Sequence, residues 1–330
     1  MVKVSVLVAV YNAEPYLSQC LDSLLGQTLR DIQVICVDDC SSDRSPDILQ
    51  TYASKDNRVE VIRLRENRGQ AHARNVGLTV DRGQYVTFLD SDDWFSADAL
   101  ACAVEVFERC PHTDTVLFGV MRCMGTPVAF QGTPYPLPPF EVLTGKEAFE
   151  LSLDWTIHGV YIARKSLYDR FPYDESCRAY SDDNTTRLHY FLSHEVRLCE
   201  GVYYYRQNPL SVTHRASVRR FDYLRANESM KRQLAELGVG AGVMRRYETV
   251  RWRVLIDLYM FYHCHGRELS RADRRYGLSE LRRVWSTIER PLLDRWLTGK
   301  FGYHPMPCWF LFRVQEWLYF TLRGWQGKNQ

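Results

Sequence analysis

Two short clusters of carboxylate side chains have the type and spacing to do chemistry. The first is Asp38-Asp39, the second reads Asp-Ser-Asp-Asp at residues 90–93, and each follows an apolar stretch. Two carboxylates one residue apart, as in Asp90-x-Asp92, can point the same way where a strand ends. Mutual repulsion among these carboxylates requires a cation, and Mg²⁺ or Mn²⁺ with oxygen ligands suits such a site. The spacing predicts a divalent-metal site that leaves coordination positions for a diphosphate.

The sequence lacks the glycine-rich loops that commonly bind phosphate groups. Neither GxGxxG nor GxxxxGK[ST] follows an apolar stretch, so backbone amides are not the obvious phosphate ligands. The metal would instead neutralise the diphosphate. This chemistry suits a reaction whose leaving group is a nucleoside diphosphate.

Alternating strands and helices must position these clusters. The strands are predicted at residues 4–10, 33–37, 59–64 and 85–89, and the helices at 14–25, from 45 onward and at 70–80. Ser45 is expected as the helix cap, with Pro46 in the first turn. This order predicts an α/β fold with a doubly wound, mostly parallel sheet. Ligands of such sheets bind beyond the carboxyl ends of the strands, where both acidic clusters lie.

The rest of the chain is less regular. A strand is predicted at residues 116–121, and the proline-rich segment 127–139 is expected to be a loop. From about Phe221 the pattern becomes helical and rich in arginine and aromatic residues. The predicted domains are therefore a catalytic domain at 1–217 and a mainly helical region at 218–330.

Composition narrows the functional class. The 330-residue chain is 45% hydrophobic with a net charge of +2, so its overall charge does not favour nucleic acid as a partner. It has no apolar run of about 18 residues that would span a membrane and no signal-peptide pattern at its start. The ten cysteines form no CxxC pair and are expected to be small buried thiols. These features predict a cytoplasmic protein.

An ordered series of motifs resembles the inverting family 2 glycosyltransferases, which have the GT-A fold. The matching segments are residues 4–12, 37–43, 66–69, 73–78, 88–94, 180–183, 203–206 and 211–214. The resemblance covers roughly residues 1–217. It implies transfer of a sugar from a nucleotide sugar, expected to be uridine-based, to a hydroxyl of a saccharide or lipid-linked acceptor. Bacterial surface-polysaccharide or lipopolysaccharide synthesis is the implied setting.

The resemblance also assigns residues to the nucleotide. The implied contacts are Val10, Tyr11, Asn12, Asp38, Asp39, Arg68, Arg74, Asp90 and Ser91. Asp39 would accept a hydrogen bond from the base, at uracil N3–H. Asp38 would contact the same nucleoside or shape the turn. Arg74 would serve the nucleotide or tie its helix to the sheet.

Metal and catalytic roles follow in the same way. Asp92 is the implied principal metal ligand, with Asp90 nearer the ribose or a metal-bound water. The implied late basic contacts are His214, at the metal, and Arg215, at the diphosphate. Asp183 is the expected general base. Asp182 stands where the family commonly has glutamate, so the base is one of these two aspartates.

Three further residues are candidates for the acceptor site. Asp93 either caps the turn after the fourth strand or contacts the acceptor or a metal-bound water. Trp155 and His158 either line the acceptor pocket or belong to the protein core.

Other functions fit parts of the pattern. A catalytically inactive nucleotide-sugar-binding protein would keep the same carboxylates. A receiver domain would use Asp90 as phosphoryl acceptor, but no lysine follows residues 116–121 before Lys146. A nucleotidyltransferase would normally have a glycine-rich, basic loop after the first strand.

The C-terminal region combines arginines with aromatic residues. Residues 245–283 are basic, and tryptophan, tyrosine and phenylalanine recur at residues 307–325. Tryptophan and tyrosine favour the membrane–water interface. These aromatics either rest on the inner face of the membrane or pack on the catalytic domain or on a second subunit, as in a homo-oligomer.

Overall fold

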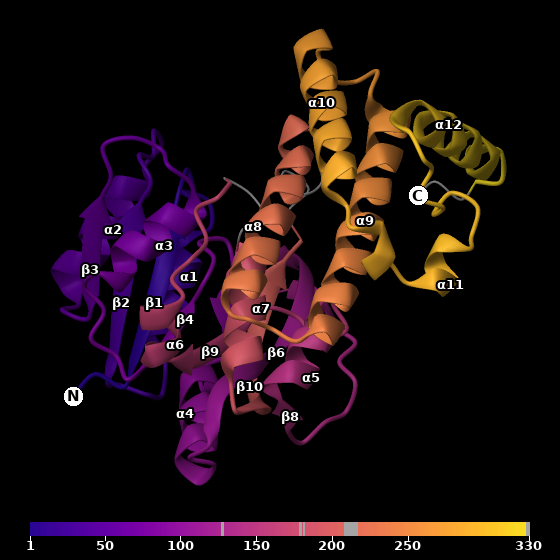
Figure 1. Ribbon diagram of the computed structural model, residues 1–330. Coiled ribbons are helices and arrows are strands. Elements are labelled where there is room, and N and C mark those ends of the chain that lie inside the picture. Colours follow the sequence, from indigo (N-terminus) through magenta and orange to yellow (C-terminus); the bar gives the residue numbers. More distant parts are fainter. Residues whose placement is uncertain (127–128, 178–179, 181, 208–216, 328–330) are drawn as a thin grey trace. The chain divides into compact units, whose positions relative to one another are not determined.

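The chain forms two compact units, Met1–Ser211 and Val212–Gln330. The computed structural model describes residues 1–126, 129–177, 180, 182–207 and 217–327 (Figure 1). Each unit has its own hydrophobic core, so the two are described separately. The predicted boundary at residue 217 falls close to this division, and the catalytic role assigned to residues 1–217 stays a prediction.

The first unit alternates strands and helices. Its strands are β1 (Val4–Val10), β2 (Ile32–Asp38), β3 (Val59–Arg63), β4 (Tyr85–Phe88), β5 (Trp94–Phe95), β6 (Thr113–Thr126), β7 (Ala129–Pro134), β8 (Leu143–Thr144), β9 (Tyr161–Arg164) and β10 (Glu195–Arg206). Its helices are α1 (Leu17–Leu25), α2 (Ser45–Lys55), α3 (Gln70–Leu78), α4 (Ala99–Arg109), α5 (Gly145–Ser152), α6 (Lys165–Arg170) and α7 (Asp182–Leu192).

The strands form one sheet with a parallel part and a mixed part. The order is β3-β2-β1-β4-β9-β6-β10-β5, with β7 on β6 and β8 on β10 (Figure 1). Strands β3, β2, β1 and β4 are all parallel. Strand β9 pairs antiparallel with both β4 and β6, whereas β6 and β10 run parallel. The carboxyl ends of β1, β2 and β4 therefore lie at one edge, as the sequence predicts.

Helices cover both faces of this sheet. Alternate residues of β1, from Val4 to Val10, share a core cluster with α1, α2 and α4. Leu7 points the other way, into a cluster with α3, α5, α6 and α7. The near-continuous apolar sequence of β1 follows from this burial on two faces.

Three sequence-based expectations are wrong. Residues 129–134, expected as loop, form β7, because they pair along β6. Ser45 does not cap α2, because its hydroxyl accepts the Ala13 N–H at 2.9 Å instead. Cys264 and Cys308 are exposed, so the expectation of buried thiols fails for these two.

The second unit is helical. It contains η2 (Val218–Phe221), α8 (Asp222–Glu236), α9 (Ala241–His265), α10 (Arg271–Thr287), η3 (Arg290–Leu292), α11 (Arg295–Thr298) and α12 (Trp309–Trp325). The long helix α9 packs against α8, α10 and α12. Its Trp252 is buried and stacks obliquely on Phe312 of α12, with ring centres 5.6 Å apart.

Helix α12 has one face in this core and one face exposed. Phe312 and Phe320 are buried. The exposed apolar residues of the helix are Phe310, Leu311, Val314, Trp317, Leu318, Leu322 and Trp325. No helix in the described part of the chain is both long and apolar enough to cross a membrane. The tail aromatics thus divide between packing and exposure, and contact with a membrane or a second subunit stays a prediction.

A candidate active site at the carboxyl ends of the strands

The loops after β1 and β2 are joined directly. Val10 and Asp38 are register partners, and the Asp39 N–H donates to the Val10 carbonyl at 2.8 Å. The Asn12 side chain accepts the Ser42 N–H at 2.8 Å. Tyr11, between them, is 54% exposed. Its ring is therefore accessible to a ligand at this edge.

Strained backbone marks the same region. Among the described residues, the non-glycine residues with positive φ are Asn12 (50°), Cys40 (64°), Trp155 (60°) and Tyr180 (68°). Left-handed backbone costs about 1–2 kcal/mol for residues with a side chain. Asn12 and Cys40 lie in the loops after β1 and β2, and Trp155 lines the pocket described below. Such strain commonly accompanies function.

Asp38 and Asp39 play different parts. Asp38 is buried, and its carboxylate accepts the Ser41 N–H at 3.0 Å, which shapes the turn after β2. The Asp39 carboxylate accepts the N–H groups of Arg68 and Gly69, each at 2.8 Å. Gly69, with φ of 94°, immediately precedes α3. Asp39 is thus fixed in place, and each of its oxygens retains a lone pair for a further donor. The Arg68 side chain is exposed.

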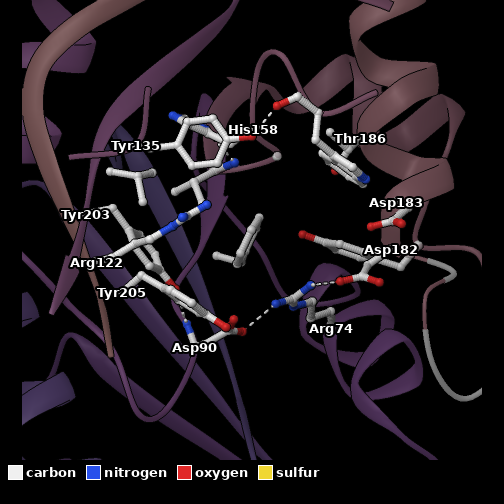
Figure 2. A pocket seen from close by; sticks show the side chains of 16 residues that line it. Arg74, Asp90, Arg122, Tyr135, His158, Asp182, Asp183, Thr186, Tyr203 and Tyr205 are labelled. Atoms are coloured by element: carbon white, nitrogen blue, oxygen red, sulfur yellow. Dashed lines mark hydrogen bonds and ion pairs between the residues drawn. The ribbon is translucent and has the colours of Figure 1, made fainter. Parts of the chain in front are cut away.

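Arg74 links two of the predicted carboxylates. Its guanidinium donates to Asp90 at 2.7 Å and lies 3.9 Å from Asp182, while its carbon is 4.1 Å from the Phe88 ring centre (Figure 2). Burial lowers the pKa of Arg74, but Asp90, Tyr173 and Asp182 raise it by more. Burial raises the pKa of Asp90, and Arg74 opposes this effect. The arginine therefore stays charged and holds the two acids together.

Asp90 and Asp93 close a tight turn around Ser91 and Asp92. The Asp93 N–H donates to the Asp90 carbonyl at 3.0 Å. Burial, and then the neighbouring Asp90 carboxylate, raise the pKa of Asp92 to about 6. This is the electrostatic situation that a divalent cation relieves.

Asp93 connects the turn to β10 through hydrogen bonds. It is 1% exposed, and its carboxylate accepts the Tyr203 hydroxyl and the Arg206 N–H, both at 2.7 Å. Arg206 also donates to the Asp92 carbonyl at 2.8 Å. These contacts account for the burial of Asp93, and its role toward an acceptor stays a prediction.

A pocket of about 360 Å³ opens beside this turn (Figure 2). It is lined by Arg74, Phe88, Asp90, Val120, Arg122, Tyr135, Trp155, His158, Gly159, Val160, Tyr173, Asp182, Asp183, Thr186, Tyr203 and Tyr205. Six predicted site residues are among them: Arg74, Asp90, Trp155, His158, Asp182 and Asp183. Residues Val10–Asn12, Asp38, Asp39, Arg68, Ser91, Asp92 and Asp93 do not line it. His214 and Arg215 lie outside the described residues.

Part of the pocket wall was missed by sequence reasoning. Val120 and Arg122 of β6 are register partners of Tyr203 and Tyr205 of β10. Alternate residues of a strand share a face, so all four line the pocket. Tyr204 points elsewhere and stacks on Trp94, with ring centres 5.2 Å apart. The alternation was visible in the sequence, but the pairing of β6 with β10 was not.

Helix α7 carries Asp182 and Asp183 in its first turn. At that end, the Thr185 hydroxyl accepts the Asp174 N–H at 3.0 Å. At the other end, α5 approaches so closely that a Cβ on Gly145 would lie 2.2 Å from the Ser193 carbonyl oxygen. The two acids therefore stand on a helix fixed at both ends, opposite the turn that holds Asp90 (Figure 2).

Trp155 and His158 form another part of the wall. The Trp155 ring lies under the Arg187 guanidinium, 4.9 Å from ring centre to carbon, and its carbonyl accepts the Tyr135 hydroxyl. His158 is 5% exposed, and burial lowers its pKa to about 4. A neutral imidazole therefore faces the pocket at neutral pH.

The residues at the turn fit a divalent-metal site in which substrate phosphates and water supply the remaining ligands. Within the described part of the chain, no group of three or more His, Cys, Asp and Glu residues could hold a metal alone. Mg²⁺, however, is commonly held by one or two carboxylates together with substrate phosphates and water. Asp92, with its raised pKa beside Asp90, suits that arrangement.

Comparison with known proteins identifies the family. A model described as glycosyl transferase family 2 matches residues 5–176, just over half of the chain. The chain belongs to this family. The resemblance seen in the sequence is thereby confirmed, and the receiver and nucleotidyltransferase alternatives are excluded.

Relatives of this family 2 protein share parts of its sequence. Glycosyltransferase EpsJ of Bacillus subtilis is 36% identical over 221 residues, covering 64% of this chain and 62% of that protein. Poly(ribitol-phosphate) β-N-acetylglucosaminyltransferase TarS of Staphylococcus aureus is 29% identical over 209 residues, covering 62% of this chain and 35% of that protein. The chain thus spans less than two thirds of either relative's length.

Solved structures confirm the fold of the family 2 chain. The crystal structure of S. aureus TarS 1–349 in complex with UDP-GlcNAc matches with a TM-score of 0.75 and 20% identity. The match covers 99% of this chain and 92% of that one. The predicted GT-A-like α/β fold with a helical C-terminal region is confirmed.

Proposed function

We propose that the protein transfers a sugar from a UDP-sugar to an acceptor hydroxyl with inversion at the anomeric carbon. The observation that carries the proposal is the pocket with Arg74 and Asp90 on one side and Asp182 and Asp183 on the other. A leaving group and a general base must face each other across the sugar in an inverting transfer. The catalytically inactive alternative would leave the second pair of acids without a chemical role.

The donor's nucleoside would occupy the loops after β1 and β2. Asp39, held by two backbone N–H groups, is positioned to accept the uracil N3–H. Tyr11 is exposed beside it and offers a ring on which a base can stack. The TarS structure with UDP-GlcNAc supports a uridine donor by fold likeness.

The diphosphate would lie at the turn formed by residues 90–93. Asp92, with Asp90 beside it, would hold Mn²⁺ or Mg²⁺. When bound, that cation neutralises the negative charge that develops on the departing diphosphate. Arg74 stays charged between Asp90 and Asp182 and links the two sides of the pocket through its contacts with both.

Asp183 is the proposed general base. Its carboxylate would accept the proton of the acceptor hydroxyl while that oxygen bonds to the anomeric carbon. The bond from this carbon to the diphosphate oxygen breaks on the opposite side, and UDP leaves with the electron pair. Asp183 lines the pocket beside Asp182, and the family resemblance assigns the proton transfer to Asp183.

The acceptor would be a saccharide or polyol chain of the bacterial cell surface. The name of TarS refers to poly(ribitol phosphate), and that of a relative from Bacillus spizizenii, 45% identical over 101 residues, does likewise. These names support a role in the synthesis of cell-surface polymers. The glycosidic linkage that the enzyme forms is left to experiment.

Ligand-dependent thermal unfolding tests the donor class. The full chain would be heated with UDP, GDP, dTDP and CDP, each with and without Mn²⁺. Because a ligand of the folded state raises its stability by mass action, UDP with Mn²⁺ should give the largest shift. Release of UDP from a panel of UDP-sugars, with candidate acceptors, then tests turnover.

Either step can contradict the proposal. A larger shift with another nucleotide would reject the uridine donor. UDP binding without turnover, over a wide acceptor panel, would favour the inactive sugar-nucleotide binder.

A further inference from the structure

One arginine of the pocket, Arg122, is solvent-exposed and forms no ion pair with the described residues. Arg122 lines the wall built by β6 and β10, and its guanidinium carbon lies 5.0 Å from the centre of the Tyr135 ring. Within the described residues, no carboxylate forms an ion pair with Arg122. Arg74, on the opposite side, is paired with Asp90 at 2.7 Å. The two arginines of one pocket are therefore in different electrostatic states.

Further hydrogen-bond donors stand beside Arg122. Tyr205 is its register partner on the neighbouring strand, and its hydroxyl has no hydrogen bond within the described part of the chain. Burial, and then the nearby Asp93, raise the pKa of Tyr205, so the hydroxyl keeps its proton. Adjacent strands are about 4.8 Å apart. Arg122 and Tyr205 can thus reach one small group together.

His158 lines the same pocket, but its ring nitrogens face the protein. Its Nδ1 accepts the Val160 N–H at 3.2 Å, so the proton of the neutral ring resides on Nε2. That Nε2 is enclosed by the protein, and a backbone hydrogen bond with Phe118 partly offsets the effect of burial on the pKa of the ring. The Tyr190 hydroxyl donates to the His158 carbonyl at 2.6 Å and fixes the residue.

The positions of the charges assign this region to the acceptor. Asp182 and Asp183, the candidate bases, must contact the acceptor hydroxyl, and they line the same pocket as Arg122. Asp39 and Asp92, which serve the nucleotide, do not line it. Figure 2 shows Arg122 and Tyr205 across the pocket from Asp183. An acceptor that presents its hydroxyl to Asp183 would therefore extend toward Arg122.

We propose that Arg122 and Tyr205 bind a carboxylate or phosphate group of the acceptor. The enzyme would thus glycosylate an anionic saccharide or polyol chain and discriminate against neutral ones. A guanidinium forms paired, charge-assisted hydrogen bonds with either group. The inference rests on the glycosyl transfer proposed above and specifies its acceptor.

Saturation-transfer NMR on the full chain loaded with UDP and Mn²⁺ tests the inference. The probes are glucuronate against glucose, and glycerol phosphate against glycerol. Both anionic probes should bind more tightly than their neutral partners. Arg122→Gln should weaken anion binding roughly ten- to hundredfold, the loss of one charge-assisted contact. Arg122→Lys should restore part of it.

Arg109→Gln is the matched control, because Arg109 is 68% exposed on α4 and does not line the pocket. It should bind all probes as the unaltered chain does. Thermal unfolding with UDP and Mn²⁺ should give the same shift in all variants. This readout separates the inference from the proposed function. If the unaltered chain does not bind UDP, the proposed function itself is rejected.

Three outcomes overturn the inference while UDP binding persists. The first is that neither anionic probe binds. The second is that anions bind equally to the unaltered chain and to Arg122→Gln. The third is that Arg122→Gln weakens UDP-glucuronate binding more than UDP-glucose binding, which would assign the arginine to the donor sugar.

Discussion

The two units of the chain use polar and apolar residues in opposite ways. In the first unit, polar residues stand at strand ends, where Arg74 joins Asp90 and Asp182 beside a pocket. In the second unit, charged residues are buried for structure: Glu248 and Arg251, each about 1% exposed, pair at 2.8 Å. Most of its exposed large apolar side chains lie on α12. Chemistry is therefore expected from the first unit and surface contact from the second.

The largest expected effect is at Asp183, the proposed general base. Asp183→Asn should lower kcat by about 10²–10⁴-fold, because the acceptor hydroxyl loses its proton acceptor. The UDP-dependent thermal shift should persist, because Asp183 does not serve the nucleotide. Asp182→Asn should lower kcat by a smaller factor. Steady-state kinetics measure both effects. Near-normal turnover in Asp183→Asn, together with loss of turnover in Asp182→Asn, would assign the general base to Asp182.

A smaller effect is expected at the metal site. Asp92→Asn should weaken UDP binding in Mn²⁺ by at least about tenfold while leaving the metal-free affinity unchanged, because it removes a ligand of the cation. Titration calorimetry with and without Mn²⁺ measures both. Asp169→Asn, at a residue 61% exposed on α6, is the control. An equal Mn²⁺ effect in Asp92→Asn and the control would contradict the assignment.

A third prediction concerns pH and the second unit. Glu316 is fully buried, and burial raises its pKa from 4.5 to about 8. The folded unit thus keeps a proton that the unfolded chain releases above about pH 4.5. The stability from this group is complete below that pH and is lost as pH rises toward 8. Glu316→Gln should therefore unfold at a higher temperature than the unaltered chain at pH 8.5.

The gain at pH 8.5 should be on the order of a few kcal/mol in unfolding free energy, and it should vanish near pH 4.5. Thermal unfolding followed by circular dichroism at both pH values measures it. Glu236→Gln, at an exposed position of α8, is the control. A pH-independent difference between Glu316→Gln and the unaltered chain would show that the glutamate is ionised in the folded state.

The smallest effect is expected on α12. Trp317 is 55% exposed on its apolar face. If this face rests on a membrane, Trp317→Gln should lower binding to anionic vesicles about tenfold, since one large apolar side chain leaves the bilayer interface. Vesicle flotation measures this binding, and the control is Met124→Gln, at an exposed position of the first unit. Equal flotation of both variants, or none by the unaltered chain, would favour contact with a protein instead.

The sequence predicts the parallel half of the sheet well because each feature there is local. The apolar run at Val4–Val10 specifies a strand buried on both faces. Parallel pairing then brings Asp39 and Asp90 to one edge without any further information. The family resemblance added Asp183, which lies far along the chain yet lines the pocket with Asp90.

The rest of the site depends on contacts that local patterns do not encode. Strand β7 forms in a proline-containing segment because β6 offers an edge. Arg122 and Tyr205 become neighbours only through the pairing of β6 with β10, about eighty residues apart along the sequence. Likewise, the burial of the His158 ring results from packing around it. The features of the site that the sequence did not reveal thus depend on long-range strand pairing and on side-chain packing.

The alternating wall of β6 and β10 has an evolutionary consequence. Tyr203 is constrained by its bond to Asp93, whereas Arg122 and Tyr205 hold no part of the turn that carries Asp90 and Asp92. After gene duplication, exchanges at these two positions would alter the acceptor while the donor machinery stays intact. Diverging copies of such an enzyme could therefore acquire new acceptors one residue at a time, without passing through an inactive ancestor.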